Sequence, residues 1–375
     1  MGGKKKTIKK NSVDFMLLIS VIGLVFIGLI MVFSSSWPEG MVQFNDGYYF
    51  FKSQISAAIL GFVGLLFFMN FKYTHFIKLA LPIFILAIIL GLLILSPLGA
   101  ERKGATRWLD FGFVMFMPSD AIKLGSIIFF AAFLSNKGDK IRTLFGGTIP
   151  SLIIIGIACG LIIIQKDLGT TITLAITLVG MLFVAGMNLY HLGFIGLASV
   201  GALVYAITSP GNEYRMRRIL SFRDPFADKL YSGWQAVQSL YALGSGGIFG
   251  LGLGKSRQKF FYIPEAHNDF IYAIIGEEVG LIGTVLVLVL FMIVIWRGII
   301  IAIKSEDTFG TFLASGLTAL VAVQSLINIA VVTSSIPTTG INLPFISFGG
   351  TSLLFYMVGI GILLNISRYS KIDRS

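Results

Sequence analysis

The chain has 375 residues, of which 55% are hydrophobic and only 13% are charged. A soluble domain needs a charged surface and rarely reaches such values, so this composition excludes an ordinary soluble enzyme and indicates an integral membrane protein. The net charge of +11 does not point to nucleic acid, because no recognisable base-reading module accompanies it.

Ten apolar runs of roughly 17 to 25 residues recur along the chain, and each is long enough to cross the hydrocarbon core as a helix. We expect these spans near residues 14–33, 54–70, 76–96, 119–134, 149–164, 170–186, 190–208, 270–296, 310–333 and 348–366. They predict an all-α polytopic protein with a basic tail at 1–13, a single membrane domain at 14–367 and a short tail at 368–375. The first run is too long for the core of a cleaved secretory signal, so we expect an uncleaved signal-anchor.

The placement of lysine and arginine sets the expected orientation. Most basic residues of the short loops fall on one side, which the positive-inside rule assigns to the cytoplasm together with both termini. One long outer loop, residues 209–267, breaks this pattern. Its basic residues are Arg215, Arg217, Arg218, Arg223, Lys229, Lys255, Arg257 and Lys259. A solvated loop that pairs with lipid headgroups would explain this excess, and so would a site for an anionic, phosphorylated ligand.

Several familiar kinds of site are not expected. In the glycine-rich stretch 244–256, Phe249 stands where a nucleotide P-loop requires glycine. We therefore expect a re-entrant or amphipathic segment, whose N–H groups could still face a phosphate. Cys159 is the only cysteine, which excludes a disulfide within the chain, and the three scattered histidines do not make a zinc site. A divalent cation, Mg²⁺ or Mn²⁺, is a compatible cofactor, but the sequence shows no dedicated cage for it.

Polar side chains gather near the outer ends of several spans, where embedded charge is costly. Asp120 and Lys123 share a helix face, either as a structural ion pair or with Lys123 facing an anionic substrate. Asp167 and Thr170 lie in the hairpin between the fifth and sixth spans, where capping of the next helix is the simplest role. The stretch 334–352 contains two prolines and three glycines. Such broken backbone has to be buried in protein or line a cavity, and we expect a cavity wall.

The strongest cluster precedes the eighth span and contains Glu265, His267 and Asp269. Asp269 can be only an N-cap at the favourable end of the helix dipole. A carboxylate partly withdrawn from water beside a basic loop is also what a general base requires, so both roles stay open. Glu277 and Glu278 lie about two turns deeper and are expected to bond neighbouring helices or backbone.

Together these motifs resemble the SEDS family, the group of FtsW, RodA and SpoVE. The hallmark segment is GLGLGKSRQKFFYIPEAHNDFIYAIIGEEVGLIG at residues 250–283. Further matching motifs are GATRW at 104–108, PSDAIK at 118–123, QKDLGT at 165–170, RRILSFRDPF at 217–226, GWQAVQSLYALGSGGIFG at 233–250 and IPTTGINLPFISFGGTS at 336–352. The resemblance covers roughly residues 12–370 and is greatest to the FtsW and SpoVE branch.

The resemblance implies a ten-helix peptidoglycan glycosyltransferase. Such proteins polymerise lipid II, a disaccharide-peptide linked through pyrophosphate to undecaprenyl, and work with a class B penicillin-binding protein. The family's essential outer-face aspartate falls on Asp269, which we expect to act as the base of an inverting reaction. The candidate substrate-binding residues are Lys123, Asp120, Arg107, Asp167, Arg215, Arg217, Arg218, Lys255, Arg257, Glu265 and His267. Lys123 and the arginines and lysine of the long loop are the candidates for neutralising the pyrophosphate.

Two departures from the family pattern affect the expected geometry. Asp120 stands where the family has a longer glutamate, and Lys166 replaces the proline of the QPDLG hairpin.

Two other functions compete with the polymerase. A lipid II flippase needs a site that is reachable from both faces, whereas the polar clusters gather on one. A non-catalytic division scaffold would not require a carboxylate at a helix mouth. Division, sporulation and maintenance of cell shape are all compatible roles.

Overall fold

A computed structural model describes residues 12–102, 105–112, 115–209, 216, 218, 222, 225–226 and 233–371. Ten apolar helices form the membrane body, and each overlaps one predicted span. They are α1 (Phe15–Phe44), α2 (Tyr49–Asn70), α3 (His75–Leu92), α4 (Pro118–Ser135), α5 (Ile149–Ile164), α6 (Leu168–Val184), α7 (Leu189–Thr208), α10 (Ile271–Ile303), α11 (Thr308–Val332) and α12 (Gly350–Tyr369). Within the described residues, eight helices are long and apolar enough to cross a membrane, while α6 and α7 provide two shorter apolar segments. The predicted helical, multi-pass membrane protein with about ten spans is confirmed.

Three short strands were not predicted. β1 (Gly99–Arg102), β2 (Ala105–Asp110) and β3 (Met115–Phe116) form an antiparallel sheet with β2 in the middle. Ala100 pairs with Trp108, and Leu109 pairs with Phe116. Strands as short as these carry too little alternation of polar and apolar residues to be told from a polar loop. The segment read as an outer loop is therefore partly ordered as a sheet.

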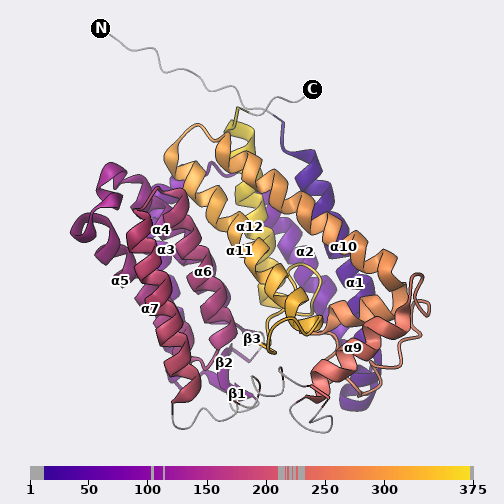
Figure 1. Ribbon diagram of the computed structural model, residues 1–375. Helices are drawn as coiled ribbons and strands as arrows, with labels where there is room; N and C mark the ends of the chain where they lie inside the picture. The colour runs from indigo at the N-terminus through magenta and orange to yellow at the C-terminus, as the bar shows by residue number, and fades with distance from the viewer. Residues whose placement is uncertain are drawn as a thin grey trace.

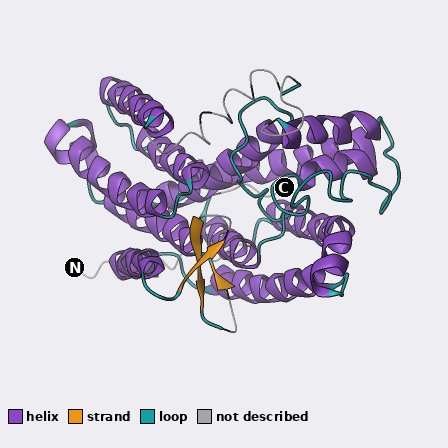
Figure 2. Ribbon diagram, turned by 90° about the horizontal axis from the view of Figure 1, so that it is seen from below, coloured by secondary structure: helices purple, strands orange, loops and turns teal. Residues whose placement is uncertain are grey.

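One end of the helical body carries the chain termini, and the opposite end carries the strands and α9. α1 begins and α12 ends at the top of Figure 1, whereas the strands and α9 (Trp234–Gly246) lie at the bottom. Figure 2 looks onto this bottom end and shows the strands lying across the helix ends. α9 belongs to the segment expected to be one long loop, so that segment contains a helix that packs against α10.

α11 is the centre of the packing, because it contacts α4, α6 and α10. α4 is buried over nearly its whole length, which explains how its polar first turn is kept from lipid. α7 instead contacts α6 and leaves Tyr190, Phe194 and Leu197 exposed. Large apolar side chains on an outer helix are what a lipid-facing surface requires.

Helix ends at the opposite, terminal end are tied together by side chains. Asp14 caps α1 by accepting from the Leu17 N–H at 3.1 Å, and it accepts from Arg297 Nε of α10 at 2.9 Å. Asp307 caps α11 by accepting from the Gly310 N–H at 2.7 Å and also accepts from the Tyr73 hydroxyl. The N-termini of α1 and α11 are thus capped by carboxylates, and Asp14 also ties α1 to the Arg297 side chain of α10.

A glycine in α1 allows the closest approach to the non-helical segment 334–349. A Cβ atom at Gly28 would lie 2.6 Å from the Phe345 carbonyl oxygen and 2.8 Å from Ile346 Cα. Because both obstacles are backbone atoms, we expect Gly28→Ala to lower the stability of the folded protein by about 1 to 3 kcal/mol. Thermal unfolding of the purified protein in detergent measures this loss. Gly156→Ala in α5 is the matched control, since a Cβ there meets no atom within 4 Å, and equal unfolding temperatures for the two variants would contradict the prediction.

Candidate active site

Asp269 lies directly before α10, at the end of the body opposite the termini. Its side chain is partly buried. The N-cap of α10 is Phe270, which makes no side-chain capping bond, so the alternative in which Asp269 only caps this helix is wrong. No described residue donates a hydrogen bond to the Asp269 carboxylate. The carboxylate therefore keeps its acceptor capacity for something outside the described chain.

The surroundings of Asp269 change its acidity. Burial raises the pKa of this carboxyl to about 6, and the negative charge of Glu265 acts in the same direction. The positive charge of Arg107 opposes this rise in pKa, Asp167 adds to it and Arg218 again opposes it. A carboxylate with a pKa near 6 is ionised at neutral pH and is basic enough to take a proton from a bound hydroxyl.

The backbone around Asp269 is held from two sides. Asn328 of α11 donates from Nδ2 to the Asp269 carbonyl oxygen at 2.8 Å and to the Ile341 carbonyl oxygen at 2.7 Å. Ser347 Oγ donates to the Asn268 carbonyl oxygen at 2.7 Å. The Asn328 amide thus fastens the start of α10 to the segment 334–349, and carbonyl groups of this irregular backbone are satisfied by protein side chains. Whether the segment also lines a cavity stays a prediction.

Gly340 leaves space beside the Asp269 carboxylate. Its φ is +72°, and a Cβ at this position would lie 3.4 Å from Asp269 Oδ2. The positive φ favours glycine, and the missing side chain leaves backbone facing the acid.

Two polar side chains of α11 were missed by the sequence analysis. Gln324 donates from Nε2 to the Asn342 carbonyl oxygen at 2.9 Å, and Asn328 donates from Nδ2 to the Ile341 carbonyl oxygen at 2.7 Å. Both lie in an otherwise apolar span and are four residues apart. A pair of buried amides on one face of a membrane helix is a signal for bonding to non-helical backbone, and it was available in the sequence.

Two arginines stand near the acid from different parts of the chain. Arg107 of β2 donates from Nη2 to the Lys166 carbonyl oxygen at 3.0 Å. Arg218 donates from Nη1 to the Thr338 carbonyl oxygen at 3.1 Å. The structure therefore brings together Asp269 and four of its predicted companions, namely Glu265, Asp167, Arg107 and Arg218. Arg215 and Arg217 lie outside the described residues.

Asp167 has the local role expected of it. It accepts from the Thr170 N–H at 3.0 Å and from Thr170 Oγ1 at 2.9 Å, which caps α6. Lys166, in place of the family's proline, adopts a φ of +55°. The hairpin is nevertheless closed, and its Lys166 carbonyl is the group that orients Arg107.

Asp120 and Lys123 form a buried pair within α4. Their charged atoms are 2.9 Å apart, and the side chains are only 2% and 6% exposed. Ser352 Oγ of α12 donates to Asp120 at 2.8 Å, and Lys123 Nζ donates to Gln324 Oε1 at 3.4 Å. The structural ion pair is therefore present, while the alternative in which Lys123 also meets an anionic substrate stays a prediction. The shorter aspartate still reaches the lysine, so the departure from the family's glutamate does not break the contact.

His267 points into the protein. It is 2% exposed, and its ring lies 4.5 Å from the Phe50 ring and 5.4 Å from the Phe348 ring, between centroids. Its Nδ1 lies 3.4 Å from Glu39 Oε2 at the end of α1. This position favours a structural role over the substrate contact expected from the sequence.

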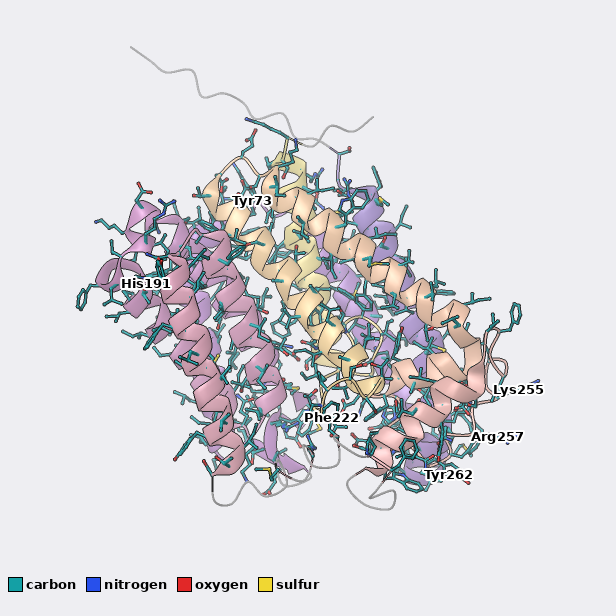
Figure 3. The ribbon with its side chains drawn as sticks, in the orientation of Figure 1. Tyr73, His191, Phe222, Lys255, Arg257 and Tyr262 are labelled. Atoms are coloured by element: carbon teal, nitrogen blue, oxygen red, sulfur yellow. The ribbon has the colours of Figure 1, made fainter. Side chains whose placement is uncertain are left out.

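Lys255 and Arg257 lie apart from the other arginines. Figure 3 shows both at the edge of the molecule beyond α9. Both side chains are exposed, and neither is among the charges that shift the pKa of Asp269. Among the described basic residues of the long segment, Arg218 therefore acts on Asp269, whereas Lys255 and Arg257 do not.

The glycine-rich stretch supports a break in α10. Gly280 has a φ of +73°, which interrupts the helix. The N–H groups of Leu251 and Gly252 donate to the Glu277 and Glu278 carbonyl oxygens at 2.9 and 3.0 Å. These N–H groups are thus occupied by the protein, so the alternative in which they face a phosphate is wrong for them.

Glu277 and Glu278 bond backbone and neighbours, as predicted. Lys259 Nζ lies 2.9 Å from Glu278 Oε1 and donates to Ser34 Oγ of α1 at 3.1 Å. Glu277 accepts from the Arg257 N–H at 2.9 Å and from the Ser256 hydroxyl. The short helix that follows Asp269 is thereby held at its far end as well.

No group of three or more histidine, cysteine, aspartate or glutamate side chains suited to a metal ion occurs in the described part of the chain.

Comparison with known proteins decides the family. A family model described as "Cell cycle protein", covering FtsW, RodA and SpoVE, matches residues 15–372. Stage V sporulation protein E of Bacillus subtilis is 43% identical over 366 residues, which cover 97% of this chain and 100% of that protein. The chain belongs to the FtsW/RodA/SpoVE family.

Other members of the FtsW/RodA/SpoVE family agree in sequence and in fold. A probable peptidoglycan glycosyltransferase FtsW of Trichlorobacter lovleyi is 40% identical over 369 residues, covering 98% of this chain and 96% of that one. A chain from the solved structure "Structural coordination of polymerization and crosslinking by a peptidoglycan synthase complex" superposes with a TM-score of 0.79 at 25% identity, covering 96% of this chain and 99% of that one. Thermus thermophilus RodA gives 0.71 at 23% identity, covering 96% and 98%, which supports the same fold.

In this FtsW/RodA/SpoVE member, removing one partner of the buried Lys259–Glu278 pair near the Gly280 break should be strongly destabilising. We expect Lys259→Met to lower the free energy of unfolding by about 3 to 5 kcal/mol, because it leaves the Glu278 charge buried without its cation. Lys52→Met is the matched control, since its pair with Asp46 is 69% and 36% exposed and such pairs contribute about 1 kcal/mol or less. Thermal unfolding in detergent compares the two variants.

The double variant Lys259→Met with Glu278→Gln should recover part of the lost stability, since it removes the unpaired charge. Equal losses for Lys259→Met and Lys52→Met would show that the buried pair does not hold the break.

Proposed function

We propose that the chain is a peptidoglycan glycosyltransferase that polymerises lipid II at the extracytoplasmic face of the membrane. The observation that carries this proposal is the Asp269 carboxylate, which is partly buried, has a raised pKa and accepts no hydrogen bond from any described residue. The positive charges of Arg107 and Arg218 both act on this carboxylate and both lower its pKa. The names of similar proteins, including the probable peptidoglycan glycosyltransferase FtsW of Trichlorobacter lovleyi, support the same activity.

The proposed chemistry uses Asp269 as a general base. The carboxylate takes the proton of the acceptor's GlcNAc 4-hydroxyl, and that oxygen attacks the anomeric carbon of the donor. The bond from this carbon to the pyrophosphate oxygen breaks, and undecaprenyl pyrophosphate leaves with the electron pair. One carboxylate and no covalent sugar intermediate give inversion at the anomeric carbon.

The leaving pyrophosphate requires positive charge more than a general acid. Arg107 and Arg218 are the described residues that meet this need, because their guanidinium groups act on the same carboxylate and are anchored to loop carbonyls. A fixed guanidinium can bind two phosphate oxygens without further ordering. Lys123, which pairs with Asp120, stays a further candidate for this role.

The orientation and the partner are parts of the same proposal. Basic residues of the short connections, including Lys72, Lys137 and Lys140, favour a cytoplasmic location for the end that carries the termini, which puts Asp269 outside. The fold shared with a chain of a peptidoglycan synthase complex supports a class B penicillin-binding protein as the partner. Lipid II would enter the site from the outer leaflet.

The decisive experiment compares the wild type with Asp269→Asn. Each is purified with its cognate class B penicillin-binding protein and supplied with lipid II, and glycan strands are separated by gel electrophoresis. The wild type should form polymer, and the variant should lose at least about a hundredfold of the rate, which is the usual contribution of a general base. Equal rates of polymer formation by the wild type and Asp269→Asn would contradict the role of Asp269 as the base. Lipid II translocation in vesicles without polymer from either protein would favour the flippase.

The raised pKa of Asp269 predicts the pH dependence. The base is the ionised carboxylate, so kcat/KM should be level above a pH of about 6 and fall with decreasing pH below it. Arg107→Gln removes a charge that lowers this pKa, so the acid limb should move to higher pH. Glu265→Gln removes a charge that raises the pKa, so the limb should move to lower pH. Shifts in the same direction for both variants would contradict the assignment of Asp269 as the titrating group.

A further inference from the structure

The side chain of Asn328 lies between the two backbones that meet at Asp269. It belongs to α11 and is only 1% exposed. Its Nδ2 atom donates to the Asp269 carbonyl oxygen at 2.8 Å and to the Ile341 carbonyl oxygen at 2.7 Å. Both hydrogens of the amide are thus used. A single nitrogen joins the residue that carries the acid to the residue that follows Gly340.

Gln324 fastens the same segment from one turn earlier in α11. Its Nε2 atom donates to the Asn342 carbonyl oxygen at 2.9 Å. Its Oε1 atom accepts from the Tyr356 hydroxyl of α12, so this anchor is itself held by a neighbouring helix. The segment is therefore fixed at two successive carbonyl groups, and these bonds keep the Gly340 backbone beside Asp269.

The remaining polar atom of Asn328 argues against a role in stability alone. Asn328 Oδ1 is buried and has no hydrogen-bond partner among the described residues. A buried acceptor without a donor costs folding free energy. Asn365 of α12 is equally buried, yet it accepts from the Tyr73 N–H at 2.9 Å and donates to the Met69 carbonyl oxygen at 2.8 Å. Stability alone would favour a residue without the unsatisfied acceptor, so the amide at 328 is explained by the two carbonyls that it holds.

The Asp269 carboxylate has to be placed through its backbone. No described residue donates a hydrogen bond to it, so no bond along the side chain sets its direction. A bond to the Asp269 carbonyl fixes the backbone from which the carboxylate extends and leaves both carboxylate oxygens available to a hydroxyl. Reacting atoms have to lie about 3 to 3.5 Å apart, so a small shift of this backbone would separate the base from its proton.

We propose that Asn328 is a positioning residue, which holds Asp269 against the segment at Gly340 and so places its carboxylate for the reaction. This inference rests on the proposed glycosyl transfer. Asn328 is buried and acts only through Asp269, whereas Gln324 supports it by fixing the segment that Asn328 binds. Loss of the Asn328 amide should let the two backbones separate and admit water to the carboxylate.

Steady-state kinetics of Asn328→Leu, with the penicillin-binding partner and lipid II, test this role. The kcat should fall roughly ten- to a hundredfold, because misplacing a reacting group by about 1 Å has an effect of this size. The KM for lipid II should change by less than about twofold, since a buried amide makes no contact with substrate. Burial is the main cause of the raised pKa of Asp269, so entry of water should lower this pKa and move the acid limb of kcat/KM to lower pH. Asn328→Asp keeps the shape of the side chain without the amide donors and should show the same loss of kcat.

Asn365→Leu is the matched control, because Asn365 also uses a buried amide to fasten backbone. Its partner Tyr73 lies at the end of the body that carries the termini (Figure 3), far from Asp269. This variant should lower the unfolding temperature at least as much as Asn328→Leu, since it leaves the Tyr73 N–H and the Met69 carbonyl without their partner. Its kcat and its acid limb should equal those of the wild type. Elution volume and unfolding temperature establish that each variant is folded.

An infrared titration separates failure of this inference from failure of the proposed function. The difference between the spectra of the wild type and Asp269→Asn isolates the Asp269 carboxyl band and gives its pKa without turnover. A lower pKa in Asn328→Leu and an unchanged pKa in Asn365→Leu would support the positioning role, even if the wild type formed no polymer and the proposed function failed. A folded Asn328→Leu protein with the kcat and the Asp269 pKa of the wild type would overturn the inference. A change in KM with kcat unaltered would overturn it as well, because Asn328 would then contribute only to binding.

Discussion

The break in α10 at Gly280 is the constraint on which the rest of the site depends. A Cβ at this residue would lie 2.3 Å from the Gly250 nitrogen and 2.5 Å from the Ile248 carbonyl oxygen, so only glycine allows the two backbones to meet. The hydrogen bonds that the helix loses are replaced by bonds to residues 247–252. A short helix, 271–279, is thereby separated from the long membrane segment and held at an angle of its own, with Asp269 at its start.

The acidic groups at the two ends of this short helix have opposite environments. Glu277 and Glu278 are buried and satisfied by a lysine, hydroxyls and backbone N–H groups, so they stabilise the break. Asp269 receives no hydrogen bond from the described residues, and burial raises its pKa. An unsatisfied carboxylate costs folding free energy. That cost is tolerable because the neighbouring backbone is fastened by Asn328 and Ser347, and it leaves a base able to act on a ligand.

Much of this could be predicted because it depends on local composition. Hydropathy located the spans, since a helix that crosses lipid must be apolar over its whole length. Family motifs located Asp269 and its neighbours Arg107, Asp167 and Glu265. The pattern could not show that Lys123 is paired or that His267 faces Glu39, because a polar residue at a helix mouth looks the same whether its partner is a substrate or another helix. Lys255 and Arg257 were grouped with Arg218 only because they share one segment.

The sequence by itself determined the membrane body, the acid at the mouth of α10 and the family. These follow from apolar length and from residues adjacent in the chain. Only the tertiary structure decided which charges act on Asp269, because Arg107, Asp167 and Arg218 come from three distant segments. It also decided that, among the described basic residues of the long segment, Arg218 acts on Asp269 while Lys255 and Arg257 do not. Coulomb interactions depend on distance in space, and contacts across the bundle are set by packing that no stretch of sequence contains.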